Sequence, residues 1–109
     1  MDKVLLITTT VGSAEEAEKL AESVIEKRLA GCAQISGPVT SLYWWQGKME
    51  KEQEYSVMLK STESLYRELE QFLKEIHPYE TPEIIAVPVT ACSEAYGKWL
   101  LAELKSVTD

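Results

Sequence analysis

His77 is the residue in this chain with the clearest potential for metal chemistry, and it is the only histidine among 109 residues. Its imidazole is the commonest type of transition-metal ligand, and the Cys32 thiolate would be a soft ligand for the same ions. One histidine and one cysteine cannot form a tight site within a single chain, so further ligands would have to converge from other copies. The residues therefore make His77 and Cys32 candidate ligands for Cu(II) or another divalent metal, with no obligatory cofactor.

Both candidate ligands also have a purely structural interpretation, which the sequence leaves open. His77 could end the helix before it and hydrogen-bond in the turn that follows. Cys32 could be a small buried apolar residue, as free cysteines often are. Cys92 precedes a predicted helix, but none of its neighbours in the sequence indicates a redox role. Metal binding is therefore a hypothesis that needs geometry to support it.

A run of three aromatic residues, Tyr43-Trp44-Trp45, is the second feature with functional potential. On a strand, Tyr43 and Trp45 would face one way and Trp44 the other, so both faces would carry large apolar groups. A chain of this length could cover one such face with helices but hardly both, which favours packing between subunits. A compatible interpretation is an aromatic wall of a cleft between subunits. The polar residues expected beside that wall are Lys48, Lys60, Tyr79 and Glu83.

The acidic residues do not form a catalytic set. Glu80 and Glu83 are close in sequence, but no residue supplies a nucleophile or a second histidine beside them. The alternating row of Glu50, Glu52 and Glu54 is expected to be a solvated face or a row of ion pairs between subunits. We therefore expect no enzymatic activity, and a small hydrolase or isomerase is the least favoured of three function classes.

Composition and charge exclude several classes of partner. The formal net charge is -7, and the 11 Lys and Arg residues are scattered, which argues against nucleic acid and against an anionic membrane surface. The apolar run Val4–Ile7 is too short for a secretory signal, and no run reaches the length of a transmembrane helix. The sequence therefore predicts one domain over residues 1–109 in the cytoplasm, with reduced thiols at Cys32 and Cys92.

Hydrophobic periodicity and turn residues predict four strands and three helices. The first helix should begin at the capping box Ser13-x-x-Glu16 and stop at Gly31. Pro78 must end the second helix, because the residue before a proline is pushed out of the α region. The expected strands are residues 4–11, 32–46, a third around 55–59, and 84–89. The expected helices are residues 14–30, 63–76 and a short C-terminal helix capped by Ser93.

This order of elements predicts an α+β protein, a ferredoxin-like βαββαβ sandwich with an extra C-terminal helix. The residues of the first strand are apolar or β-branched at both odd and even positions, which predicts a strand that is covered on both faces or central in the sheet. The ferredoxin-like topology places it in the interior. Pro88 cannot donate a ladder hydrogen bond, which predicts that the last strand lies at an edge. The second and third strands should form a long overhanging hairpin, with a bulge or kink at Gly37-Pro38 and a turn at Gly47-Lys48.

Three motifs in this order resemble the CutA divalent-cation-tolerance family over nearly the whole chain. They are Lys27-Arg28-Leu29-Ala30-Gly31-Cys32-Ala33, Thr40-Ser41-Leu42-Tyr43-Trp44-Trp45-Gln46-Gly47-Lys48 and His77-Pro78-Tyr79-Glu80-Thr81-Pro82-Glu83-Ile84. The resemblance implies a homotrimer in which long hairpins extend each sheet into its neighbour. It also implies a cytosolic role in tolerance to copper and other divalent metals, without established catalysis. Some members carry a further histidine and cysteine where Ile76 and Thr9 stand here.

The leading hypothesis is therefore a non-enzymatic homotrimer that acts in divalent-metal tolerance and binds metal weakly through His77 and Cys32. The alternative is a trimeric signalling or adaptor protein that binds a small, anionic metabolite in clefts between its subunits. That alternative depends on fold-level analogy, which is a weak guide to function.

Overall fold

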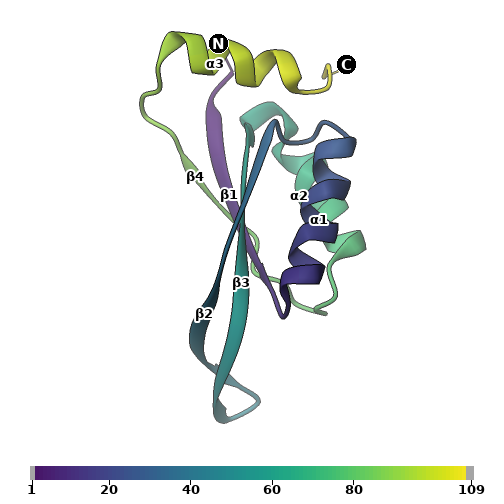
Figure 1. Cartoon of the computed structure of the whole chain (residues 1–109), viewed down its shortest axis with the longest axis vertical. Coiled ribbons are helices and arrows are strands. Elements are labelled where there is room, and N and C mark those ends of the chain that lie inside the picture. The colour runs from purple at the N-terminus through teal and green to yellow at the C-terminus, as the bar shows by residue number, and fades with distance from the viewer. Residues whose placement is uncertain (1, 108–109) are drawn as a thin grey trace.

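The computed structural model describes residues 2–107, which form a four-stranded antiparallel sheet and three α-helices (Figure 1). The elements run β1 (Val4–Val11), α1 (Ala14–Glu26), β2 (Cys32–Trp45), β3 (Lys48–Thr62), a 3₁₀ turn (Glu63–Leu65), α2 (Tyr66–Ile76), β4 (Ile85–Pro88) and α3 (Glu94–Glu103). The strand order is β2-β3-β1-β4, with β1 inside and β4 at an edge. The predicted α+β, ferredoxin-like βαββαβ sandwich with an extra C-terminal helix is confirmed.

The core lies between the sheet and helices α1 and α2, which share one layer (Figure 1). Alternate residues of β1 point into this layer, so Leu5, Ile7 and Val11 are buried while their neighbours are only half-buried. The sequence predicted that this strand is covered on both faces or central in the sheet; it is central, and in the single chain the helices cover one of its faces. Neither α1 nor α2 covers the second face of the sheet. α3 reaches this face at Lys60, while Ile85 and Val87 of β4 are exposed on it.

The first helix ends at Glu26, four residues before the predicted end at Ala30. Arg28 adopts a left-handed conformation with φ 57°, and the amides of Arg28 and Leu29 reach back to the carbonyls of Ile25 and Val24. This pair of bonds is a Schellman motif, in which glycine usually occupies the left-handed position. Gly31 serves packing instead, because a Cβ there would lie 2.6 Å from a methyl carbon of Leu100.

The third strand, predicted around residues 55–59, is much longer and spans Lys48–Thr62. Other predicted ends shift by smaller amounts. The residues 63–65 at the start of the second predicted helix form the 3₁₀ turn, and β4 is one residue shorter at each end than predicted. Ser93 caps α3 as predicted, since its hydroxyl accepts the amide hydrogen of Tyr96. Within the described part of the chain, no helix has both the length and the apolar character needed to cross a bilayer.

The long hairpin overhangs the rest of the sheet, as predicted (Figure 1). β1 pairs with β3 only from Thr62 back to Tyr55, whereas β3 continues to Lys48 in pairing with β2. The turn residues Gln46 and Gly47 have φ values of 49° and 78°, the left-handed pair that joins twisted strands tightly. The sequence predicted a bulge or kink at Gly37-Pro38, and the hairpin register does shift there, between Ser36 and Val39. This shift lies where β1 ends and the overhang begins.

Candidate functional site

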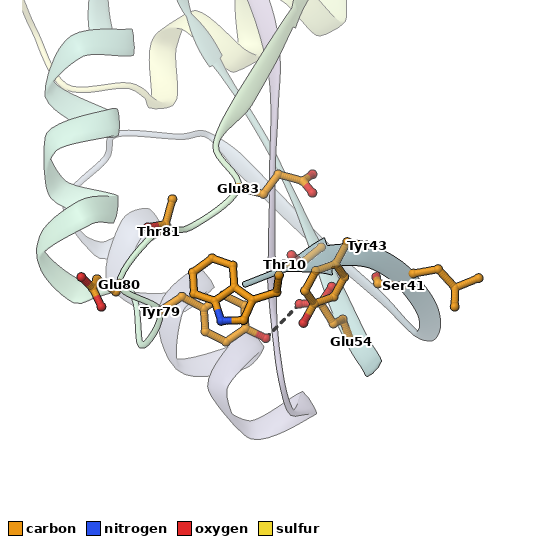
Figure 2. Close-up of a pocket in the computed structure, with 10 residues that line it drawn as sticks. Thr10, Ser41, Tyr43, Glu54, Tyr79, Glu80, Thr81 and Glu83 are labelled. Atoms are coloured by element: carbon orange, nitrogen blue, oxygen red, sulfur yellow. Dashed lines mark hydrogen bonds between the residues drawn. The ribbon is translucent and has the colours of Figure 1, made fainter. Parts of the chain in front are cut away.

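A cavity of about 570 Å³ lies at the base of the overhang, where β1 ends. Its volume is within the range typical of small-molecule sites. The hairpin contributes Ser41, Leu42, Tyr43, Trp45 and Glu54; the segment after α2 contributes Tyr79, Glu80, Thr81 and Glu83; β1 contributes Thr10. Figure 2 shows these side chains as a group drawn from three separate parts of the chain.

The alternation of β2 decides which aromatic residues reach the cavity. Tyr43 and Trp45 line it and Trp44 does not, as the period of two along a strand predicts. Ser41 belongs to the same parity and lines the cavity beside them. The register shift at Ser36/Val39 sets this parity, because an extra residue in one strand changes which side chains share a face.

The end of α2 brings Tyr79 to the hairpin. Pro78 follows His77, which leaves the helical region with φ -71° and ψ 136°. The Tyr79 hydroxyl then donates a hydrogen bond of 2.9 Å to Oε2 of Glu54 (Figure 2). Burial, followed by this bond and the Glu54 charge, raises the pKa of Tyr79, so its hydroxyl remains a donor at neutral pH.

Glu54 does not belong to a solvated acidic row, contrary to one sequence expectation. Its exposed fraction is 7%, whereas Glu52 on the same face is exposed. Partial desolvation and the charges of Glu52, Glu54 and Glu50 raise the pKa of Tyr43. Within residues 2–107, the side chains that line the cavity include three glutamates and no Lys or Arg. The cavity is therefore aromatic and negatively charged.

His77 is buried, and both of its ring nitrogens have partners. The Tyr79 amide donates to Nδ1 at 3.0 Å, so the proton of the neutral ring is on Nε2. Nε2 lies 3.0 Å from the Thr10 carbonyl oxygen and 3.0 Å from Oγ1 of Thr9. These contacts match the structural interpretation, in which His77 ends α2 and hydrogen-bonds in the following turn. A metal could bind either nitrogen only by displacing one of these partners.

The fold does not bring His77 and Cys32 together. Cys32 is the cross-strand partner of Lys60, and both side chains lie on the face of the sheet opposite the α1–α2 layer. His77 instead contacts Thr9, whose side chain points into that helical layer. Among residues 2–107, no three His, Cys, Asp or Glu side chains are grouped to hold a metal ion. Metal binding by His77 and Cys32 stays a prediction that would require two separate positions in each chain, or ligands from other copies.

The cavity unites four of the seven residues predicted to form a cleft, namely Tyr43, Trp45, Tyr79 and Glu83. Trp44 faces away, and Lys48 is exposed at the hairpin turn. Lys60 lies over the ring of Tyr96 in α3, 5.3 Å from its centroid, with 3.3 Å between its Nζ and the Tyr96 hydroxyl. Sequence reasoning missed Thr10, Ser41, Leu42, Glu54, Glu80 and Thr81 as lining residues. Strand parity could have found Ser41, but no local signal indicates that Glu54 is buried.

The environment of His77 predicts how stability depends on pH. Burial lowers its pKa below the ordinary 6.5, with the Thr10 bond and the charges of Glu16 and Glu54 acting the other way. The unfolded chain therefore takes up a proton near pH 6.5 that the folded chain resists. The stability contributed by neutral His77 is present above that pH and is lost as the pH falls through the folded pKa.

This is measurable by NMR titration, because a single histidine needs no resonance assignment. We expect a midpoint below 6.5, and a His77→Gln variant whose melting temperature changes less than that of the native protein between pH 7 and pH 5. A midpoint at or above 6.5 would contradict the expectation.

Comparison with known proteins agrees with the sequence motifs and the topology. Residues 5–103 match the family described as CutA1 divalent ion tolerance protein. The divalent-cation tolerance protein CutA of Pyrococcus horikoshii is 38% identical over 102 residues, which cover 94% of this chain and 99% of that one. The same-named protein of Escherichia coli is 40% identical over 101 residues, covering 93% and 90%.

Solved structures give the same result for the fold. The crystal structure of CutA1 from Oryza sativa superimposes with a TM-score of 0.94 at 32% identity, covering 97% of each chain. The match extends over the sheet, the helices and the long hairpin together, since so little of either chain is left out. Identity, coverage and topology therefore agree that this chain belongs to the CutA1 family of divalent ion tolerance proteins.

Proposed function

We propose that this protein acts in divalent-cation tolerance as a non-catalytic homotrimer in the cytoplasm. The observation that carries the proposal is the overhanging half of the β2–β3 hairpin. Its exposed fractions are 64% for Leu42, 72% for Trp44, 50% for Trp45 and 67% for Met49. Contiguous apolar surface of this kind marks association sites in water-exposed proteins.

Self-association suits this surface because the hairpin is apolar on both faces. Trp44 and Met49 are cross-strand partners on one face, and Tyr43 and Trp45 occupy the other. No helix of the described chain reaches the overhang, so only another molecule can cover it (Figure 1). The uncovered edge strand β4, with Ile85 and Val87 exposed, offers a second apolar surface for a neighbouring copy.

Replacing Trp44 by Ser should weaken this association. Loss of a large central aromatic side chain typically costs about 2 kcal/mol or more at an interface. Light scattering over a dilution series should give three times the single-chain mass for the native protein, and Trp44→Ser should dissociate at a concentration at least tenfold higher.

Lys51→Ser is the matched control, because Lys51 lies on the same face of the hairpin and is exposed. It should leave the dissociation range unchanged. A native protein that stays monomeric and well folded at micromolar concentration would refute the trimer.

The cytoplasmic assignment is part of the same proposal. Cys32 and Cys92 are free thiols, which suits a reducing compartment. A relative from Archaeoglobus fulgidus is described as periplasmic, so fractionation of cells that express this protein is the direct test.

We further propose that metal binding is weak and depends on His77 and Cys32 separately. His77 must give up a hydrogen bond of its ring to become a ligand, and this competes with coordination. Cys32 lies on the face of the sheet opposite the α1–α2 layer, where half-burial leaves the thiol within reach of an ion or of another copy.

A calorimetric titration with Cu(II) should therefore show binding much weaker than that of a preformed site. Cys32→Ser and His77→Gln should each reduce the binding enthalpy, with Cys92→Ser as the control thiol. If both variants bind Cu(II) as the native protein does, these residues are not its ligands.

A second candidate function, binding of a small molecule by a signalling or adaptor trimer, is favoured by the aromatic cavity. It has the volume of a ligand site, and it joins Tyr43, Trp45 and Tyr79 with a buried carboxylate. The site does not depend on metal binding, so the two functions can be tested independently.

A thermal-shift screen of cationic, neutral and anionic small molecules tests this second function. A ligand of the folded protein raises the melting temperature by mass action. Such a shift should disappear in Trp45→Ala, which removes a lining residue, and persist in Trp99→Ala, which changes a tryptophan outside the cavity. Shifts that survive in Trp45→Ala would place the ligand elsewhere.

A further inference from the structure

Glu54 carries a buried negative charge that lacks a positive partner within the described chain. More than nine-tenths of the residue is buried. The Tyr79 hydroxyl on Oε2 is its hydrogen-bond partner, and the ion pairs formed among residues 2–107 use Glu68, Glu94 and Glu103 instead. A buried carboxylate is unfavourable unless it is both hydrogen-bonded and paired with a charge. The hydrogen bond is present, and the positive charge is left for another group to supply.

The surroundings of Glu54 add to its negative field. Glu50 and Glu52 project from the same side of β3, and their charges act on the Tyr43 hydroxyl together with that of Glu54. Glu80 and Glu83 also line the cavity, and their carboxylates add to its negative charge. Among the residues that the structure describes, no lysine or arginine lines the cavity to offset them. An anionic metabolite would meet repulsion here, so the structure argues against the anionic ligand expected from the sequence.

A bare metal ion is also a poor fit for this position. A divalent cation needs several oxygen, nitrogen or sulfur ligands at once. The described residues contain no such group of three acidic, histidine or cysteine side chains, at the cavity or elsewhere. Glu54 would be a single ligand surrounded by rings.

Aromatic rings are instead the usual neighbours of organic cations. The face of a Tyr or Trp ring attracts an ammonium group, and sets of such rings recognise alkylated ammonium ions. Tyr43, Trp45 and Tyr79 line the cavity, and the two tyrosines lie beside the Glu54 carboxylate (Figure 2). Tyr79 also remains protonated, so it adds no competing negative charge.

We propose that the cavity binds a small organic ammonium ion, with the Glu54 carboxylate as its counter-charge and Tyr43, Trp45 and Tyr79 as its aromatic walls. This inference rests on the second candidate function, because it names the ligand class of the same cavity. It is independent of Cu(II), of His77 and of Cys32.

The test uses two probes of nearly the same shape. Choline carries a quaternary nitrogen, and 3,3-dimethylbutan-1-ol has a neutral carbon in its place. Calorimetric titration of the native, assembled protein should show choline binding at least tenfold more tightly than the alcohol, because only choline gains from the charge and the ring faces. Equal binding of the two probes would overturn the proposal.

Substitution of the counter-charge sharpens the test. Glu54→Gln keeps an oxygen acceptor for Tyr79 and should weaken choline binding at least tenfold. Glu52→Gln is the matched control, since it removes the same charge from an exposed position two residues along the strand. Glu52→Gln should change the dissociation constant of choline by no more than about twofold, because salt screens the interaction of an exposed charge with a ligand in the cavity. Equal losses in the two variants would contradict a specific role for Glu54.

Tyr43→Leu keeps the test decisive if Glu54→Gln does not fold. It retains an apolar wall but removes a ring face, so it should weaken choline binding about fivefold or more and leave the alcohol unaffected. Circular dichroism and light scattering on each variant establish that fold and assembly are intact.

Other outcomes separate the failure of this inference from that of the cavity itself. If choline does not bind and Glu54→Gln makes the assembly dissociate more easily, the missing cation is a basic side chain of another copy, and the proposal is wrong. If a neutral or anionic compound binds the native protein but not Trp45→Ala, the cavity is a ligand site and only the ammonium class is refuted.

Discussion

The structure depends on one mismatch of length, between β3 and the strand that it pairs with in the centre of the sheet. β1 ends at Val11, opposite Tyr55, and β3 continues from there to Lys48 with only β2 beside it. A two-stranded ribbon in water is marginally stable by itself, and this one is held at its base by the sheet. Its apolar side chains therefore lack the helical cover that α1 and α2 give to the rest of the sheet, and the proposed association would supply that cover.

The register shift between Ser36 and Val39 lies beside the end of β1 and helps to form the cavity there. Gly37 approaches the backbone of Tyr55 so closely that a Cβ would lie 2.8 Å from the Tyr55 ring and 3.0 Å from the Glu54 carbonyl, and its φ is 150°. The register shift beside it sets which residues of β2 face the loop after α2. The cavity is thus formed by three separate parts of the chain that meet where ordinary sheet pairing stops.

Charge then distinguishes the two candidate sites. His77 is neutral, buried and hydrogen-bonded at both nitrogens, which makes it a good structural residue and a costly metal ligand. Glu54 is buried, and the hydrogen-bond donor that reaches it from residues 2–107 is the neutral Tyr79 hydroxyl, which leaves its charge for another group to balance. The position most open to a further partner is therefore a carboxylate in an aromatic cavity, and this could not be anticipated from ligand types alone.

The sequence by itself determined the order of elements, the edge position of Pro88, the end of α2 before Pro78 and the parity of Tyr43 and Trp45, because these depend on local sterics and on the period of a strand. Only the tertiary structure decided that Arg28 rather than a glycine closes α1, and that Lys60 lies with Tyr96. It also decided that Glu54 is buried while Glu52, on the same face of β3, is exposed to solvent. Burial and charge pairing depend on which residues far apart in the sequence come into contact in the fold. A local pattern of residue types does not specify those contacts.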